Sequence, residues 1–537
     1  MCASKSSELS RRTALSLLVC GAVTAAGTVG ARKAAAQTSA DEASIDELVT
    51  RFRREFEIPG IGIAIVRPDR PDFIKGYGVR TLGQSALIDA HTLFAIASNT
   101  KAFLAAGLAL LVDAGRLSWE DPVVRHLPAF QMSDPAVTRM MTVRDLLVHR
   151  SGLPLGAGDL LQFPPGDHTR EDLLHALRYF RPATGFRAGY AYDNILYIIA
   201  GMLLEQVSGL DWDQYLRTRI FAPLGMTAAV ADSTRVQGTN HTGRHVRLGP
   251  PVIGMGRLEV VRPAESALIA PAGGINASLS DIVPWLKVQL ARGVLPDGRR
   301  LWSAAQSAQM WQPQTLISSG PGPSLEAPQR SVMQGYALGW GVSEYRQRRM
   351  LSHAGGVIGQ TTRTTLLPED GIGFVVYSNT GDGEPISGLR YALMDYLLGA
   401  PAFDWVSATR ADITKLQAEV TAAVGTGDFE PPPGLPSLPL EGYTGRYRDP
   451  WYGDIVVALA KNRLSIDFTH TPALKGALEV FGTDTFRTRF PRGAGEDAVI
   501  NFSITNGRVT GLNLKALSPL ADFSFDYQDL APVPVEP

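Results

Sequence analysis

The stretch that decides the fold begins with Ser-Asn-Thr-Lys at residues 98–101 and continues as the apolar run Ala-Phe-Leu-Ala-Ala-Gly-Leu-Ala-Leu-Leu-Val-Asp over residues 102–113. We predict a helix here, with Gly115 as its stop. Side chains three residues apart share a helix face, so the Lys101 amine can reach the Ser98 hydroxyl. A lysine whose pKa is lowered by burial can deprotonate a serine nucleophile. Taken alone, the same spacing also fits a helix-capping serine and a surface lysine.

Two further motifs carry groups that suit acyl transfer. Tyr-Asp-Asn at residues 192–194 places a phenol, which can relay a proton, next to a carboxamide, which can hold a substrate carbonyl and a lysine. His-Ala-Gly-Gly at residues 353–356 follows a strand-like run, and its glycines allow a substrate to approach the strand edge closely. The first motif alone also fits an aromatic core segment, and the second also fits a glycine-rich turn.

Together, the three motifs resemble those of the serine β-lactamase and penicillin-binding-protein superfamily. The chain is most similar to its class C β-lactamases, its D-alanyl-D-alanine carboxypeptidase B and their esterase and D-aminopeptidase relatives. Residues 142–153, Thr-Val-Arg-Asp-Leu-Leu-Val-His-Arg-Ser-Gly-Leu, resemble another signature of that superfamily. The resemblance covers residues 41–400. It implies an α/β (α+β) fold, with an antiparallel sheet flanked by helices and an all-α subdomain from about residue 120 to residue 240.

The same resemblance assigns roles to individual residues and requires neither a metal nor another cofactor. The reaction it implies is acyl transfer to a serine, followed by attack of water. The catalytic residues are Ser98 as nucleophile, Lys101 as its base and Tyr192 as the proton relay to the leaving group; the substrate-binding residues are Asn194, His353 and Gly355; the backbone N–H groups of Ser98 and Gly356 form the oxyanion hole.

One position departs from the penicillin-recognising members. They carry Lys-Thr-Gly where this chain has His353-Ala354-Gly355. A lysine is a fixed cation for a substrate carboxylate, whereas a histidine is largely neutral at pH 7. We therefore do not expect β-lactamase activity or transpeptidation as the main activity.

The rest of the hydrolase part is predicted from apolar patterning and capping residues. Residues 41–57 have the pattern of an amphipathic helix, and residues 58–66 and 73–79 that of two paired strands. We predict a helix over residues 280–292 with Ser280 as its N-cap. The polar segment 313–334 is expected to be a mobile loop.

A second domain follows a proline-rich boundary. Residues 401–439 are expected to form a helix and then a stiff linker, because residues 430–439 contain five prolines. Short alternating segments over residues 440–530 predict a small all-β barrel. Tyr-Thr-Gly-Arg-Tyr at residues 443–447 resembles the lipocalin-like barrel attached to some of these hydrolases.

The first 36 residues have the pattern of an export signal. Two arginines, Arg11 and Arg12, precede a short apolar run, and three alanines end at residue 36, which predicts a cleaved twin-arginine signal and a periplasmic protein. The alternative is an uncleaved anchor helix. Both cysteines, Cys2 and Cys20, lie in this segment, so the remaining chain has no cysteine nucleophile. No later stretch is apolar enough to predict a stable membrane span after cleavage.

Composition and motifs leave three functional hypotheses. The chain has 51 basic and 52 acidic residues, and this balance argues against binding to nucleic acid. The first hypothesis is a serine peptidase or amidase acting on short peptides, including peptides with D- or unusual residues such as linearised cyclic peptides of the microcystin type. The second is a carboxylesterase that uses the same site. The third is a non-catalytic protein whose barrel binds a ligand. The oligomeric state stays open.

Overall fold

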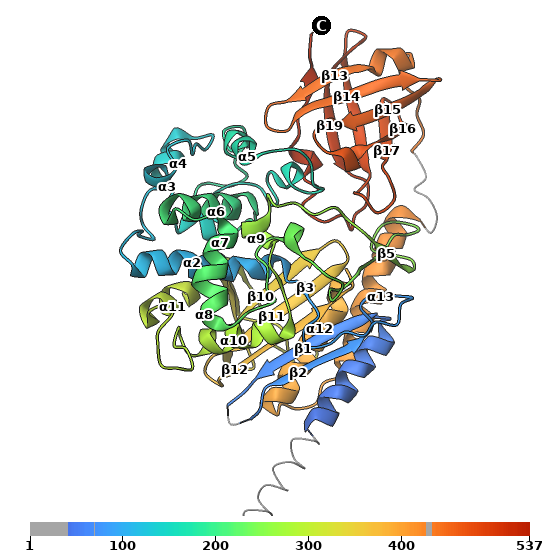
Figure 1. Cartoon of the computed structure of the whole chain (residues 1–537). Helices are drawn as coiled ribbons and strands as arrows, with labels where there is room; N and C mark the ends of the chain where they lie inside the picture. The colour runs from blue at the N-terminus through green and yellow to red at the C-terminus, as the bar shows by residue number, and fades with distance from the viewer. Residues whose placement is uncertain (1–40, 69, 426–431, 537) are drawn as a thin grey trace, which may run out of the picture.

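The computed structural model describes residues 41–68, 70–425 and 432–536, so the predicted signal over residues 1–36 lies outside the described residues. Figure 1 shows a larger part, in which helices flank a sheet, and a β-barrel formed by the carboxyl-terminal residues. This arrangement confirms the predicted α/β (α+β) fold with a following all-β barrel.

The central sheet has eight strands, and every pair of neighbours is antiparallel. All residues of two neighbouring interior strands, β1 and β12, are buried. Helices cover both faces there, which explains why these strands are almost continuously apolar. In spatial order the strands are β2 (Phe73–Gly78), β1 (Gly60–Val66), β12 (Ile372–Ser378), β11 (Gln360–Leu367), β10 (Arg348–Val357), β9 (Gly341–Tyr345), β8 (Met333–Tyr336) and β7 (Thr315–Ser319).

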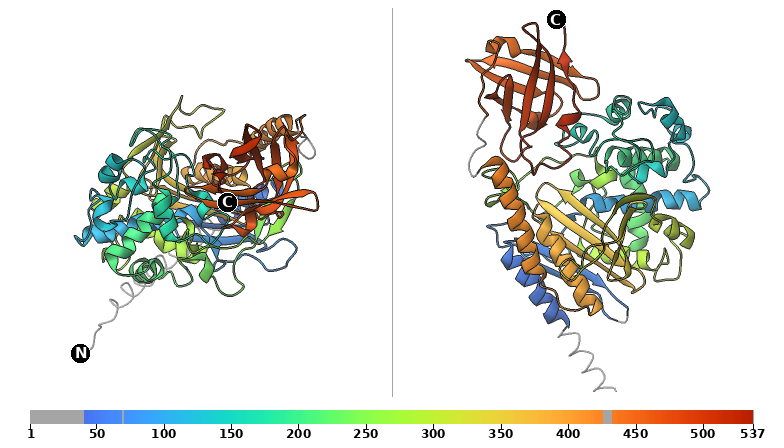
Figure 2. Two further views of the ribbon diagram at one scale, coloured as in Figure 1. Left: turned by 90° about the horizontal axis from the view of Figure 1, so that it is seen from above. Right: turned by 180° about the vertical axis from the view of Figure 1, so that it is seen from behind.

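Alternate side chains of β1 pack into two different hydrophobic cores. Ile61, Ile63 and Ile65 belong to the core beneath a helix over residues 41–55, α12 (Gly383–Leu398) and α13 (Trp405–Val424). Ala64 belongs to the core on the opposite face, with α2 (Thr100–Asp113) and α10 (Leu279–Leu290). Figure 2 shows the first three helices side by side along one face of the sheet.

The region beyond α2 is helical, as predicted, and lies at one end of the sheet (Figure 1). Short 3-10 helices, η2 (Asp145–Leu147), η3 (Asp159–Leu161) and η5 (Ser233–Arg235), link its elements, and another, η1 (Ala97–Asn99), directly precedes α2. Two small two-stranded sheets lie beside it. The elements are α3 (Val123–His126), α4 (Pro135–Met140), α5 (Arg170–Ala176), α6 (Ile195–Ser208), α7 (Trp212–Leu216), the π-helical η4 (Arg217–Phe221), α8 (Ala222–Leu224), α9 (Ala270–Gly273) and α11 (Ala304–Trp311), with β3 (Phe94–Ala95) paired to β6 (Asn276–Ala277) and β4 (Arg244–Arg247) paired to β5 (Leu258–Val261).

Two local predictions were wrong. The N-cap of α10 is Ser278, because its side chain accepts from the backbone of Asp281 while the Asp281 carboxylate accepts from Ser278. Ser280 instead donates its hydroxyl proton to Ala90 O. The segment 313–334 is not a loop throughout, since it contains β7 and the start of β8.

The carboxyl-terminal barrel is a meander whose strands pair in chain order, with β20 beside β13. The Leu512 N–H donates to Pro532 O, which ties β19 to the residues before β20 and nearly closes the barrel. Aromatic rings fill the interior: the Tyr443 ring lies 5.0 Å from that of Phe486 and 5.1 Å from that of Phe502. The strands are β13 (Gly445–Asp449), β14 (Gly453–Ala460), β15 (Arg463–Phe468), β16 (Lys475–Gly482), β17 (Thr485–Arg489), β18 (Ala498–Thr505), β19 (Arg508–Ala516) and β20 (Val533–Pro534).

Across residues 41–68, 70–425 and 432–536, no single helix combines the length and hydropathy needed to cross a membrane. One bent pair, α6 with the segment Trp212–Leu224, meets those two criteria together.

Candidate active site

The serine of the 98–101 motif lies in η1, and the lysine lies in the first turn of the following helix α2. Ala97 has a φ of 50°, a left-handed conformation that turns the chain from β3 into η1 and leaves Ser98 on the wall of a cavity. Lys101 is completely buried one turn later. Its ammonium group donates to Ser98 Oγ at 3.2 Å, to Asn194 Oδ1 at 2.7 Å and to Ala272 O at 3.0 Å. Three acceptors therefore fix the Lys101 amine against the Ser98 hydroxyl.

The environment of Lys101 makes it a base near neutral pH. Burial lowers its pKa to about 7, although the negative charges of Asp159 and Asp193 oppose this shift. A substantial fraction of the amine is therefore unprotonated at pH 7 and can accept the Ser98 proton.

Tyr192 lies on the other side of the serine. Its hydroxyl is hydrogen-bonded to Ser98, and Lys101 Nζ lies 4.8 Å from the centre of its ring. Burial raises the pKa of Tyr192 well above its ordinary value, and this effect outweighs the Ser98 bond. The phenol therefore stays protonated near neutral pH, so it can act as a hydroxyl that both donates and accepts.

A ring of aromatic groups holds Tyr192 in place. The ring of His149, from the 142–153 signature, lies 4.2 Å from that of Tyr192 and 4.5 Å from that of Tyr336. His149 Nδ1 accepts from the Asp193 N–H at 3.2 Å, and the Tyr197 hydroxyl donates to Leu147 O at 2.6 Å. The signature residues therefore form the wall behind the tyrosine.

Asn194 links the lysine to a buried carboxylate that the motifs did not predict. Its Oδ1 accepts from Lys101, and its Nδ2 donates to Asp159 Oδ2 at 2.9 Å. Gln162 Nε2 donates to the other oxygen of Asp159 at 2.7 Å. Burial raises the pKa of Asp159 to about 7. The carboxylate fixes the orientation of the Asn194 amide, so that its oxygen faces the lysine.

His353 occupies the opposite wall as a neutral ring. Its Nδ1 lies 2.6 Å from Ala354 O, which requires a proton on Nδ1, so Nε2 accepts from the Tyr336 hydroxyl at 2.7 Å. Burial and the nearby charge of Lys101 lower the pKa of His353 to about 3. This position therefore offers no cation to a substrate carboxylate.

The two glycines that follow differ in what surrounds them. A Cβ on Gly355 would lie 2.3 Å from both Ile96 O and Thr362 Oγ1, so only glycine allows β10 to approach the turn that carries Ser98. A Cβ on Gly356 would meet nothing within 4 Å. The pairing of β10 with β9 ends at Ser352. The later residues of β10 line the cavity, and the strand edge that would face β9 is not paired with it there.

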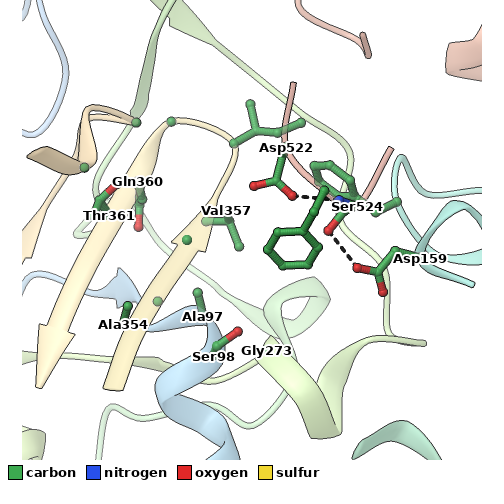
Figure 3. Close-up of a pocket in the computed structure, with 18 of the residues that line it drawn as sticks. Ala97, Ser98, Asp159, Gly273, Ala354, Val357, Gln360, Thr361, Asp522 and Ser524 are labelled. Atoms are coloured by element: carbon green, nitrogen blue, oxygen red, sulfur yellow. Dashed lines mark hydrogen bonds between the residues drawn. The ribbon is translucent and has the colours of Figure 1, made fainter. Parts of the chain in front are cut away.

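Residues from the end of the chain complete the site. Ser524 Oγ donates to Asp159 Oδ2 at 2.7 Å, a contact drawn in Figure 3. The Asp526 carboxylate accepts from the N–H groups of Gly158 and Leu160 at 2.8 and 3.0 Å. The Phe523 ring lies 5.7 Å from that of Tyr192. No motif marked this segment, because its role depends on where the barrel is attached.

Most of these groups line one cavity of about 750 Å³, whereas Lys101, His149, Tyr197 and Asp526 do not line it. Its lining combines the predicted residues with the additional ones, and Figure 3 shows Ser98, Asp159, Asp522 and Ser524 around it. In the described ranges, no group of three or more His, Cys, Asp or Glu side chains is arranged to hold a metal ion. The lining residues that bear on the chemistry are Ser98, Tyr192, Asn194, His353, Gly355, Gly356, Asp159, Asp522, Phe523 and Ser524.

Comparisons with known proteins agree with this geometry. The chain is similar to "Unguisins hydrolase ungD" of Aspergillus violaceofuscus, with 28% identity over 457 residues, 78% of this chain and 76% of that protein. It is also similar to "Protein flp" of Staphylococcus aureus, with 25% identity over 346 residues, 64% of each chain.

Solved structures share the fold at lower identity. The octameric penicillin-binding protein homologue from Pyrococcus abyssi superposes with a TM-score of 0.57 at 20% identity, over 89% of this chain and 98% of that chain. A class C β-lactamase superposes with a TM-score of 0.54 at 18% identity, over 68% of this chain and 98% of that chain.

Two family models match the sequence. A domain of unknown function, DUF3471, matches residues 430–532. The model of the Beta-lactamase family matches residues 45–397, which is more than half of the chain. This protein therefore belongs to the Beta-lactamase family of serine hydrolases.

Proposed function

We propose that this protein hydrolyses amide bonds of short peptides through an acyl intermediate on Ser98. The observation that carries the proposal is the buried Lys101 amine, which is hydrogen-bonded to Ser98 and has a pKa of about 7. The relative named as an unguisins hydrolase supports hydrolysis as the reaction. A cavity of about 750 Å³ has the size of sites that enclose small organic molecules, which favours short substrates.

The proposed reaction has two halves. Lys101 accepts the Ser98 proton while Ser98 Oγ attacks the carbonyl carbon, and the oxyanion is held by the N–H groups of Ser98 and Gly356. Tyr192 donates its hydroxyl proton to the leaving nitrogen and recovers one from Lys101, which releases the amine. Water then attacks the acyl-serine, gives up a proton through the same groups and frees the acid and Ser98.

The test compares matched substrates with the same acyl group, presented as amides and as esters, each with an L- or a D-residue. Peptide turnover that disappears in Ser98→Ala and persists in Ser465→Ala, an exposed serine of the barrel, supports an amidase or peptidase. The ratio of L- to D-rates then tests the preference for D- or unusual residues, for which linearised microcystin-type peptides are the natural follow-up.

Other outcomes separate the alternatives. Ester turnover without any amide turnover favours a carboxylesterase, because esters are cleaved more easily by the same groups. Absence of Ser98-dependent turnover on every substrate favours a binding protein.

The cellular location we propose is the periplasm, reached by the twin-arginine route. This proposal rests on Arg11, Arg12 and the following apolar run. Replacing both arginines by lysines should retain the full-length chain in the cytoplasm, as measured by cell fractionation. Unchanged export of that variant would contradict the proposed route.

A further inference from the structure

Three carboxyl groups gather at one end of the cavity. Asp159, Glu496 and Asp522 all line it, and they come from η3, from the loop before β18 and from the segment after β19. The charge of Asp522 raises the pKa of both Asp159 and Glu496, so Asp522 lies close enough to each of them to disfavour their ionised forms.

Glu496 is the informative member of this group. Only 6% of its surface is exposed, and its carboxyl group makes no hydrogen bond or ion pair with any described residue. Burial and the charges of Asp497 and Asp522 raise its pKa to about 8. A mostly buried carboxyl group without a cationic partner is costly to ionise, and here it lines the same cavity as the catalytic serine.

The second carboxylate is equally free of cations. Asp522 accepts only from the N–H of Ser524, at 2.9 Å, and forms no ion pair with a described residue. It is exposed, and Figure 3 shows it near Ser524 on the side of the cavity formed by the chain end.

The cationic side chains that line or adjoin the cavity bind to other groups. Arg247 pairs with Asp382 at 3.0 Å, and Arg363 donates to Thr362 O and to Ser387 Oγ, both at 3.0 Å. Lys101 is directed toward Ser98 and is itself partly neutral near pH 7. None of the three pairs with the acidic group.

We propose that the acidic end formed by Asp159, Glu496 and Asp522 binds a protonated amino or guanidinium group of the substrate. This inference rests on the proposed function of the same site. A bound cation would supply the missing counter-charge in a place of low dielectric, where each charge pair is worth more than in water. Carboxyl groups could bind a free amino terminus or a basic side chain equally well. The two pairs of substrates described below distinguish these possibilities.

The opposite wall is consistent with this preference. His353 is neutral where penicillin-recognising relatives carry a lysine, so the cavity offers little attraction to a carboxylate. The absence of a cation at one wall and the excess of carboxyl groups at the other both favour cationic over anionic substrates.

The experiment uses the full-length mature protein and pairs of substrates that differ by one charge. The first pair is an amide with a free amino terminus and its N-acetyl form. The second pair has a blocked amino terminus and either a lysine or a norleucine side chain. Two serine-reactive fluorophosphonates, one with an alkylammonium arm and one with a matched alkyl arm, report on the same subsite without requiring amide cleavage.

We expect one cationic substrate and the ammonium fluorophosphonate to react about tenfold or more faster than their neutral partners, the factor of a charge-assisted contact. The preference should fall severalfold in Asp522→Asn and in Glu496→Gln. Glu441→Gln, a matched change of an exposed barrel carboxyl, should leave the preference and the rates unchanged. Because Asp522 is exposed, its variant tests the charge even if Glu496→Gln folds poorly.

The outcomes separate this inference from the proposed function. Amide turnover with no preference for the cation, or a preference that survives both substitutions, overturns the subsite and leaves the function standing. A Ser98-dependent labelling preference without amide turnover supports the subsite and removes the function. If neither fluorophosphonate labels Ser98, calorimetric binding of the first substrate pair to Ser98→Ala decides: equal affinities overturn the subsite, and tighter binding of the amine supports it.

Discussion

Ser524 and Asp159 are 365 positions apart in the chain, yet the hydroxyl of the first donates a 2.7 Å hydrogen bond to the carboxylate of the second. Asp159 in turn holds the amide of Asn194, whose oxygen faces the Lys101 amine. The segment between β19 and β20 is therefore linked to the nucleophile by four hydrogen bonds, the last of which joins Lys101 to Ser98. This contact explains how the barrel and the hydrolase part form one site within a single chain.

Removing the Ser524 hydroxyl should destabilise the folded protein by an amount that depends on pH. Asp159 has a pKa of about 7, and the Ser524 bond favours its ionised form. Ser524→Ala should therefore lower the unfolding temperature more at pH 8.5 than at pH 5.5, with a loss of ~1 kcal/mol at the higher pH.

The control for this prediction is Ser524→Thr, which keeps the hydroxyl. This variant should lose less stability than Ser524→Ala, and its loss should depend less on pH. Differential scanning fluorimetry at the two pH values measures the difference, and an equal loss at both values would show that the bond does not favour the ionised form of Asp159.

The sequence predicted the parts of the site that are local in the chain. Ser98 and Lys101 are one helical turn apart, so their contact follows from helix geometry alone. Strand β1 lies within the strand predicted over residues 58–66, and its continuous apolar character was recognisable because both of its faces are covered. Tyr192 and Asn194 could be placed beside them only through the family resemblance, since no local rule brings α6 to α2.

The contacts that could not be predicted are those between distant segments with no motif. Neither Asp159 nor Ser524 belongs to a motif that the sequence reveals, and they come into contact only because the barrel packs against the hydrolase part. The error at α10 has a different cause: two serines stand close to the start of the helix, and the reciprocal bonds with Asp281 make Ser278 the N-cap and leave Ser280 as the second residue of the helix.

Replacement of Lys101 should change two quantities that can be measured independently: the catalytic rate and the pH dependence of the free energy of unfolding. Lys101→Met removes the base, so kcat/KM should fall by at least ~10²–10⁴-fold. The pKa of Lys101 is about 7 in the folded protein and 10.5 ordinarily, so the unfolded chain binds more protons between these values. The stability of the wild type relative to Lys101→Met should therefore rise as the pH increases from 7 toward 10.5.

Thermal unfolding of both proteins across this pH range measures that difference, and Lys287→Met, an exposed lysine on α10, serves as the control. A difference in stability that is independent of pH would mean that the Lys101 amine is not held near neutrality by burial.

Changing His353 should alter the charge preference of the cavity. His353→Lys places a cation where the wild type has a neutral ring with a pKa of about 3. Substrates with a free carboxylate, including β-lactams, should then acylate Ser98 about tenfold faster relative to their methyl esters. His353→Gln, which adds no charge, should not produce this change. Rates of acylation measured by mass spectrometry test the prediction, and an unchanged ratio in His353→Lys would show that this wall does not contact the carboxylate.

The two glycines of β10 should respond differently to the same added methyl group. In Gly355→Ala the new Cβ meets Ile96 O and Thr362 Oγ1 at 2.3 Å, so β10 must move away from the turn that carries Ser98. Such overpacking costs ~1–3 kcal/mol, and the displaced strand should also lower kcat/KM. In Gly356→Ala the methyl group enters open space, so the unfolding temperature should stay close to that of the wild type. Calorimetry of both variants tests the contrast; equal losses of stability would place the close approach of strand and nucleophile at a different residue.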